Sequence, residues 1–202
     1  TCGTRPCADR VASCAVDSSK PAISRAHARY VLFVLVVVYL VNMVDRQILS
    51  ILIDPIKREL DVSDTAMGLL TGFGFAAFYT IAGIPIARLS DRGDRRTIIA
   101  VGLAIWSLFT AASGLVRTFA QLAIARVLVG VGEACANPAS HSLISDYFPP
   151  ARRARAMAIF TMGGQAGVLL GLALGGYLQD AFGWRAAFFV VGFPGLAVAL
   201  VG

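Results

Sequence analysis

The sequence predicts an all-α, polytopic membrane protein. Of its 202 residues, 57% are hydrophobic and only 15% are charged, and the mean hydropathy is +0.72. Soluble domains carry about 25% charged residues. Several apolar runs reach about 20 residues, the length that a helix needs to cross a bilayer core about 30 Å thick. In such a protein the net charge of +6 is interpreted from where the basic residues lie, and it does not indicate a nucleic-acid partner.

The first three spans are predicted at about residues 30–53, 66–87 and 97–116. The first is almost wholly apolar, but two adjacent charges lie well inside it. The second carries small residues at four-residue spacing. The third follows the arginine-rich stretch ARLSDRGDRRT.

The last three spans are predicted at about residues 119–148, 154–178 and 186–202. The fourth span is longer than a bilayer requires, so we expect it to project beyond the membrane. The sixth stops at the chain end without a polar flank, and we therefore expect a truncated helix in a fragment of a longer protein. Residues 1–24 are polar and have no apolar core, so we expect a disordered tail before a transmembrane bundle over residues 25–202.

The basic residues alternate between the predicted connections. Ten lie in the N-terminal flank, the second loop and the fourth loop, and four lie in the first, third and fifth loops. The positive-inside rule assigns the more basic side to the cytoplasm, which predicts a cytoplasmic N-terminus. The ten are Lys20, Arg25, Arg29, Arg88, Arg92, Arg95, Arg96, Arg152, Arg153 and Arg155, and the four are Lys57, Arg58, Arg117 and Arg185.

Two spans carry a row of small residues along one helix face. Small residues let helix backbones approach closely in lipid, where packing drives helix association. Two interpretations are open, namely static close packing between helices and a surface on which helices slide or rock. The rows are Gly68, Gly72, Ala76 and Thr80 in the second span, and Gly163, Gly167, Gly171 and Gly175 in the fifth.

Charged and amide side chains form a polar stripe on each of two apolar spans. The stripes are Asn42, Asp45 and Arg46 on the first span, and Arg126, Glu133 and Asn137 on the fourth. Each stripe follows the helical period, so its members share one face. A charge at the centre of a membrane helix costs roughly 2.5–3.5 kcal/mol on insertion scales, and such a group indicates function by default. Both stripes must therefore face the protein interior or water.

The four charges form a neutral set. The simplest arrangement pairs Asp45 with Arg126 and Arg46 with Glu133 across an inner cavity, although exchanged partners satisfy the charges equally well. One interpretation is a static network that fixes helix register, but buried ion pairs are rarely an inexpensive route to stability. The favoured interpretation is a proton relay or substrate site. Desolvation favours the neutral carboxyl group and a nearby arginine favours its charged form, so motion that separates the pair changes its proton affinity.

Two motifs resemble those of major facilitator superfamily transporters. The loop ARLSDRGDRRTII, residues 87–99, is similar to that superfamily's G-x-L-x-D-R-x-G-R-R/K between the second and third helices. The segment RVLVGVGEA, residues 126–134, is similar to its R-x-x-x-G-x-G motif. Leu89, Asp91, Arg92, Arg95 and Arg96 match the loop motif, whereas Ala87 and Asp94 replace its glycines. The resemblance covers residues 30–202 and implies the six-transmembrane-helix half of a twelve-helix major facilitator fold.

Within that superfamily, N-x-x-D-R in the first span and G-V-G-E-A in the fourth are similar to the Spinster subfamily and its bacterial members, which implies a bacterial inner membrane. The family implies alternating access, in which two six-helix halves rock about a central site. Asp45 with Arg126 then becomes the proton-coupling site, and Arg46 and Glu133 become cavity residues. The loop residues Asp91, Arg92, Arg95 and Arg96 become a conformational latch, unless their charges only determine topology.

The predicted function is therefore a proton-coupled secondary transporter of a small amphipathic or anionic solute, with lysolipids as one candidate class. The alternatives are an organic-anion:cation symporter, since such proteins also carry G-E-A, and a transport-inactive receptor or scaffold. An enzyme is not favoured because no nucleophile–base pair or metal cluster is visible at membrane depth, and ATP drive would need a G-x-x-x-x-G-K-[ST] loop. The expected partners are a small-molecule substrate, protons, the bilayer and a C-terminal six-helix half, with no cofactor or metal.

Overall fold

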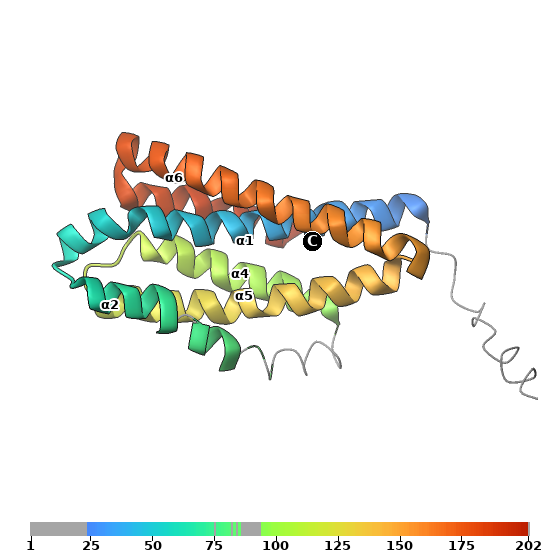
Figure 1. Ribbon diagram of the computed structural model, residues 1–202, viewed down its shortest axis with the longest axis horizontal. Helices are drawn as coiled ribbons and strands as arrows, with labels where there is room; N and C mark the ends of the chain where they lie inside the picture. The colour runs from blue at the N-terminus through green and yellow to red at the C-terminus, as the bar shows by residue number, and fades with distance from the viewer. Residues whose placement is uncertain (1–23, 75, 82, 84, 86–93, 202) are drawn as a thin grey trace, which may run out of the picture.

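The helices of the protein lie side by side in one elongated bundle (Figure 1). The computed structural model describes residues 24–74, 76–81, 83, 85 and 94–201. The predicted tail up to residue 23 and the latch residues Asp91 and Arg92 lie outside this part of the chain. The elements are α1 (Arg25–Leu60), α2 (Asp64–Gly68), the π-helical turn η2 (Leu69–Gly74), α4 (Arg95–Ser113), α5 (Phe119–Tyr147) and α6 (Pro150–Val201).

Polar residues mark the end of α1 and the starts of α2, α4 and α5. Asp61 adopts the left-handed conformation (φ 51°) and stops α1. The side chains of Ser63, Asp94 and Thr118 accept hydrogen bonds from backbone N–H groups in the first turns of α2, α4 and α5. These caps satisfy donors that a helix start leaves unpaired. Helix α1 nevertheless extends beyond the apolar run predicted at about residues 30–53 at both of its ends.

Helix α6 contains both of the last two predicted spans. Gly183 has φ 79° and ψ 167°, a conformation that side chains other than hydrogen rarely permit. The chain reverses there, so that α6 folds back on itself at one end of the bundle (Figure 1). We call residues 150–182 the first arm and residues 184–201 the second arm. Four helices of the described part, α1, α4, α5 and α6, are long and apolar enough to cross a membrane.

The glycine row of the first arm packs directly against α1. A Cβ atom added at Gly163 would lie 2.5 Å from a Val36 methyl group, and one at Gly167 would lie 2.5 Å from the Leu40 carbonyl oxygen. Gly171 meets Val44 in the same way, at 3.1 Å from its Cα and carbonyl oxygen. Three successive turns of the two helices are thus in close contact, which small residues at this spacing allow.

The glycine row of the second span makes no such contact. Nothing lies within 4 Å of a Cβ atom added at Gly68 or Gly72, and both residues are exposed together with Ala76 and Thr80. Within the described part of the chain this row therefore has no close-packed neighbour, and both interpretations of it stay predictions. The physical reason is that Met67 and Leu70, on the other side of the helix, turn into the core.

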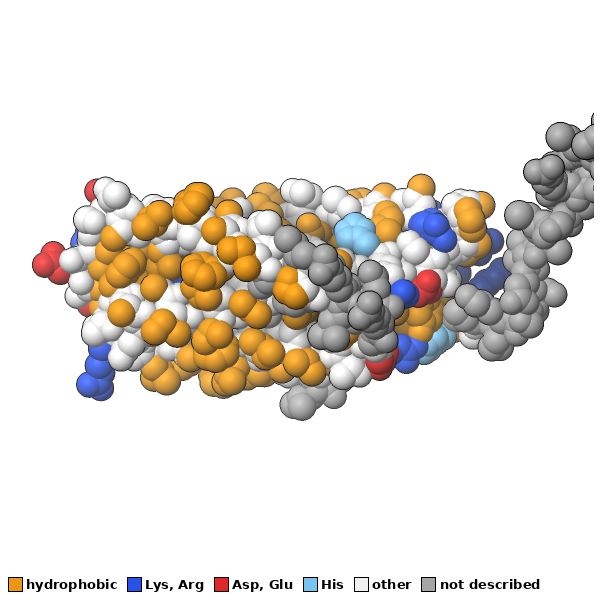
Figure 2. Space-filling view, turned by 90° about the horizontal axis from the view of Figure 1, so that it is seen from below, with side chains coloured by type: hydrophobic (Ala, Val, Ile, Leu, Met, Phe, Trp, Pro, Cys, Tyr) orange, Lys and Arg blue, Asp and Glu red, His pale blue; other side chains and the backbone are white. Residues whose placement is uncertain are grey.

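The apolar core consists of two clusters with the charged stripes between them. One cluster surrounds Ile48, Leu52 and Phe188 towards the Gly183 end. The other surrounds Leu103 and Trp106 towards the opposite end. On the face drawn in Figure 2, hydrophobic side chains cover much of the middle, and charged side chains gather towards the two ends. This distribution is that of an integral membrane protein.

Candidate functional site

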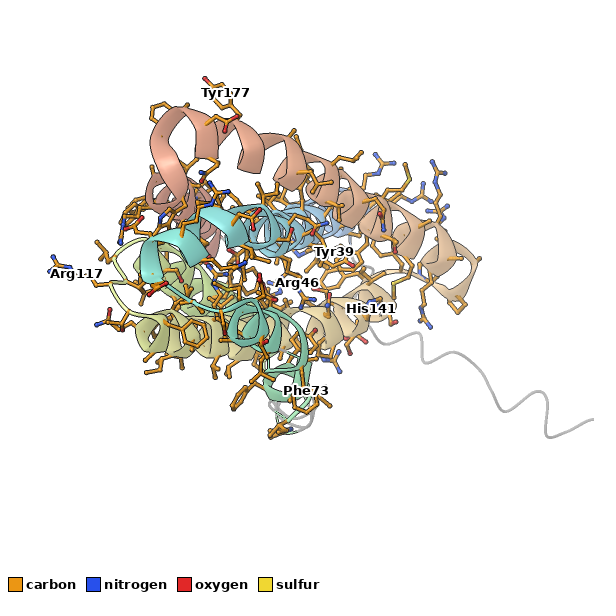
Figure 3. The ribbon with its side chains drawn as sticks, turned by 60° about the vertical axis from the view of Figure 1, so that its left-hand side comes forward. Tyr39, Arg46, Phe73, Arg117, His141 and Tyr177 are labelled. Carbon is orange, nitrogen blue, oxygen red and sulfur yellow. The ribbon has the colours of Figure 1, made fainter. Side chains whose placement is uncertain are left out.

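Asp45 and Arg46 project from the middle of α1 towards the other helices. Only 1% of Asp45 is exposed, whereas 33% of the Arg46 side chain is exposed. In Figure 3, Arg46 lies at the centre of the bundle, and Arg117, Tyr177 and Phe73 lie at its periphery. The two neighbouring charges therefore differ in exposure, since Asp45 is almost fully buried and Arg46 is partly exposed.

Asp45 joins three helices through its two carboxylate oxygens. Its Oδ2 accepts a hydrogen bond of 3.0 Å from Thr110 Oγ1 on α4. Its Oδ1 lies 3.7 Å from Nη1 of Arg126 on α5. The Arg126 guanidinium in turn lies over the Phe188 ring on the second arm of α6, with Cζ 4.6 Å from the ring centroid. The pair is in ionic contact, but its separation exceeds that of a direct hydrogen bond.

Arg46 and Glu133 form the tighter of the two buried ion pairs. Nε of Arg46 donates a hydrogen bond of 2.8 Å to Oε2 of Glu133, which is 1% exposed. The Arg46 guanidinium also lies over the Tyr79 ring, with Cζ 5.0 Å from the ring centroid. The structure therefore contains the simplest predicted arrangement of the four charges, and not the arrangement with exchanged partners.

The four charges line a cavity of about 220 Å³. Nε and Nη2 of Arg126 and Oε1 of Glu133 are buried and have no hydrogen-bond partner within the described residues. Buried polar atoms of this kind are costly unless water or a solute pairs with them. The cavity can therefore accept a polar or charged group. Its remaining lining residues are Leu49, Ser50, Thr71 and Val129.

Neither asparagine of the predicted stripes is among the residues that line this cavity. Asn42 is 2% exposed, and its Nδ2 finds no hydrogen-bond acceptor in the described part of the chain. Asn137 donates a hydrogen bond of 3.3 Å to the Tyr79 hydroxyl. Thr110 and Tyr79 were not predicted as site residues. A threonine within an apolar span is a signal for Thr110, whereas nothing in the sequence pattern singles out Tyr79.

The described latch residues contact the end of α5. Arg95 forms an ion pair with Asp146, and Arg96 donates a hydrogen bond to the Tyr147 hydroxyl. Asp94 precedes them and caps α4. Hydrogen bonds from the Thr97 hydroxyl and from the Arg96 backbone N–H hold the pKa of Asp94 below its usual range. These contacts fix the start of α4 to the end of α5.

The sequence matches the family model of the Major Facilitator Superfamily over residues 35–202. The chain belongs to the Major Facilitator Superfamily. Its fold matches that of a bacterial homolog of the human lysosomal transporter Spinster in an inward-facing, unoccupied conformation, with a TM-score of 0.82 and 37% identity. The match covers 88% of this chain and 43% of that one. The chain is thus Spinster-like, as predicted, and its fold is that of a major facilitator half.

Relatives of this chain include proteins with several transport assignments. An MFS-type efflux pump of Mycolicibacterium smegmatis is 39% identical, over 82% of this chain and 39% of its own length. A probable galactarate/D-glucarate transporter of Bacillus subtilis is 32% identical, over 91% of this chain and 42% of its own length. Protein spinster homolog 1 of Mus musculus is 31% identical, over 89% of this chain and 34% of its own length. The chain spans about two fifths of the length of these relatives.

Proposed function

We propose that this chain forms the N-terminal half of a proton-coupled secondary transporter that works by alternating access. The observation that carries the proposal is the set of two buried ion pairs facing one cavity about 220 Å³ in volume. Charges in a membrane interior are retained where a solute or proton passes. We place the protein in a bacterial inner membrane, with the basic end of the bundle on the cytoplasmic side.

Asp45 is the proposed proton carrier. Protonation would remove its negative charge and leave Arg126, which is 3% exposed, without its ionic partner. A buried unpaired cation is unfavourable, so Arg126 would then bind another anion more strongly. An anionic group of the substrate in the cavity supplies that charge. Proton binding and anion binding would thus favour each other, which is the energetic basis of coupled transport.

The proposed substrate is a small amphipathic or anionic solute, and the cavity gives both parts of such a molecule a place. Arg126 and Arg46 offer positive charge, and Leu49 and Val129 offer apolar surface. Lysolipids fit this description, and the similarity to Spinster proteins supports them.

Sugar acids are the second candidate, in the manner of an organic-anion:cation symporter. The similarity to the probable galactarate/D-glucarate and L-galactonate transporters favours them. Binding of a lysolipid and of galactarate to the purified full-length protein, measured by calorimetry, separates the two classes. Binding of neither class would leave a transport-inactive receptor or scaffold as the better account.

The substitution Asp45→Asn in the full-length protein tests the coupling role. Asparagine resembles the protonated carboxyl group and keeps a hydrogen-bond acceptor for Thr110. We expect accumulation of substrate driven by a proton gradient in proteoliposomes to be abolished, while exchange of substrate across the membrane without a gradient continues.

Asp54→Asn is the matched control, because Asp54 lies on the same helix but is exposed. It should accumulate substrate as the unchanged protein does. Gradient-driven accumulation by the Asp45 variant at the rate of this control would overturn the coupling role.

A latch at the cytoplasmic loop is the second part of the proposal. Asp91 and Arg95, with Arg92 and Arg96 beside them, would hold the two halves together on that side by ionic and charge–dipole contacts. The substitution Asp91→Ala should shift the balance between inward-open and outward-open states, as measured by the accessibility of engineered cysteines from each side. Asp180→Ala, at an exposed position on α6, should not, and equal accessibility in both variants would rule the latch out.

A further inference from the structure

A second cavity lies at the basic end of the bundle, apart from the four charges of the central site. It encloses about 90 Å³ between α1, α4, α5 and the second arm of α6. Aliphatic side chains form most of its lining, including Val31, Val34, Leu35, Ile99, Leu103 and Leu143. His27, Tyr30 and Arg96 supply its polar side chains. We call this cavity the basal groove. It is an apolar slot with polar groups beside it and few hydrogen-bonding partners within it.

The polar groups beside the basal groove are held in place by one another. Arg96 donates to the Tyr147 hydroxyl, and its Nη2 lies 3.3 Å from Nε2 of His27. The rings of His27 and Tyr147 also contact each other, with centroids 5.7 Å apart. The guanidinium therefore occupies a defined position beside the apolar slot.

The acidic groups nearby are already engaged. Asp146 pairs with Arg95, and the Asp94 carboxylate accepts from Thr97 and from a backbone N–H. Among the described residues, no carboxylate lies within salt-bridge distance of the Arg96 side chain. The exposed side chains of Arg25 and Arg29 lie on the first turns of α1, on either side of His27 in the sequence. This end of the groove is thus positively charged.

The groove lies where the membrane interface is expected. Tyr30 begins the first predicted span and is 51% exposed, and tyrosines are enriched at that level of a bilayer. Phe33 on α1 and Val101 on α4 are 65% and 52% exposed, so apolar side chains on both helices face outwards nearby. An apolar slot beside the lipid chains and a cation at headgroup level match the two halves of a phospholipid.

We infer that the basal groove binds an anionic phospholipid, with a segment of one acyl chain in the slot and the headgroup phosphate against Arg96 and His27. The enclosed volume admits only part of a chain, so the rest of the lipid stays in the bilayer. Basic pockets between membrane helices recognise anionic headgroups in this way, and the negatively charged cytoplasmic leaflet supplies them. A soluble polar ligand fits poorly because the lining offers it few hydrogen bonds.

The test uses the full-length protein, purified in detergent and freed of lipid. Bound lipid is counted by native mass spectrometry during titration with phosphatidylglycerol or with phosphatidylcholine of the same acyl chains. We expect phosphatidylglycerol to bind more tightly, and Arg96→Gln to weaken it about fivefold, the effect of removing one positive charge near a lipid surface. Arg96→Lys keeps the charge and should retain most of the preference. Arg117→Gln, at an exposed arginine of the opposite end, should bind as the unchanged protein does.

A second variant separates the slot from the cation. Ala100 lines the groove and is half-buried, so Ala100→Phe should fill the slot and weaken the binding of both lipids. Equal affinity for the two lipids in the unchanged protein would overturn the headgroup contact. Unaltered lipid binding by the Ala100 variant would overturn the groove as the site, and would fit occupation of the slot by another segment of the full-length chain. Unfolding temperatures of all variants in detergent show whether each one is folded.

Discussion

Arg46 and Glu133 illustrate how much one contact constrains a residue in a membrane interior. Their hydrogen bond is 2.8 Å long and Glu133 is almost fully enclosed. Removing one partner of a buried pair leaves an uncompensated charge and costs about 3–5 kcal/mol. The cost arises because one charge loses its partner. We therefore expect it to be the same whichever of the two helices carries the positive charge.

A charge exchange between these two residues makes this argument testable. Arg46→Glu and Glu133→Arg alone each place two like charges together, and we expect both single variants of the full-length protein to unfold at lower temperature and to lose transport. The double variant restores a neutral pair and should recover more stability and transport than either. Uptake corrected for the amount of protein, together with unfolding temperature, checks this. A double variant no better than the worse single variant would contradict direct pairing.

The four charges were predictable from the sequence because helical period fixes which residues share a face, and membrane depth makes every charge conspicuous. Thr110 and Tyr79 were not predicted, although they contact Asp45 and Arg46. Their involvement depends on how far each helix is rotated about its axis. That rotation follows from packing against the other helices, which periodicity within a single helix does not encode.

At the scale of elements, α1 and the first arm of α6 pack closely because glycines on α6 have no side chain. Gly167 fits because the Leu40 backbone occupies the space that a Cβ atom would need, at 2.5 Å. Gly176 lies on the same helix but has nothing within 4 Å of that position. A substitution at Gly167 therefore changes both helix packing and helix propensity, whereas one at Gly176 changes helix propensity alone.

We predict opposite effects of alanine at these two glycines. Alanine is favoured over glycine within a helix by about 1 kcal/mol, so Gly176→Ala should leave the unfolding temperature unchanged or raise it. Gly167→Ala gains the same propensity but forces the two backbones apart, and overpacking costs about 1–3 kcal/mol. We therefore expect a net loss of stability, visible as a lower unfolding temperature in detergent. Equal unfolding temperatures of the two variants would show that α1 and α6 can move apart at this contact without a loss of stability.

The order of the helices followed from apolar length and polar connections, but the turn within α6 did not. The sequence predicted two separate spans, and the structure joins them through Gly183 with almost no loop. The two glycine rows also had the same pattern, yet one packs on α1 and the other is exposed. Small residues show where close approach is possible, whereas the presence of a neighbouring helix depends on the whole arrangement.

At the scale of the whole molecule, the row of Gly68, Gly72, Ala76 and Thr80 is a small-residue face that the described part of the bundle leaves exposed. Such a face is better suited to a protein surface than to lipid, because it allows backbones to approach. In a transporter with two rocking halves, contacts between the halves must form and break without large side chains interlocking. We therefore propose that this row is the sliding surface of the second interpretation, with the other half of the proposed transporter as its partner.

The substitution Gly72→Trp tests this surface because no described atom lies within 4 Å of its Cβ position. We expect the full-length variant to fold, since nothing lies within 4 Å of the added Cβ atom, but to transport poorly and to favour one of the two access states. Gly176→Trp is the matched control, because Gly176 has equal space but lies on α6. Substrate uptake and the accessibility of engineered cysteines from each side measure the two effects. Uptake by the Gly72 variant equal to that of the Gly176 variant would mean that the row faces lipid, because a tryptophan in lipid has no neighbouring helix to obstruct.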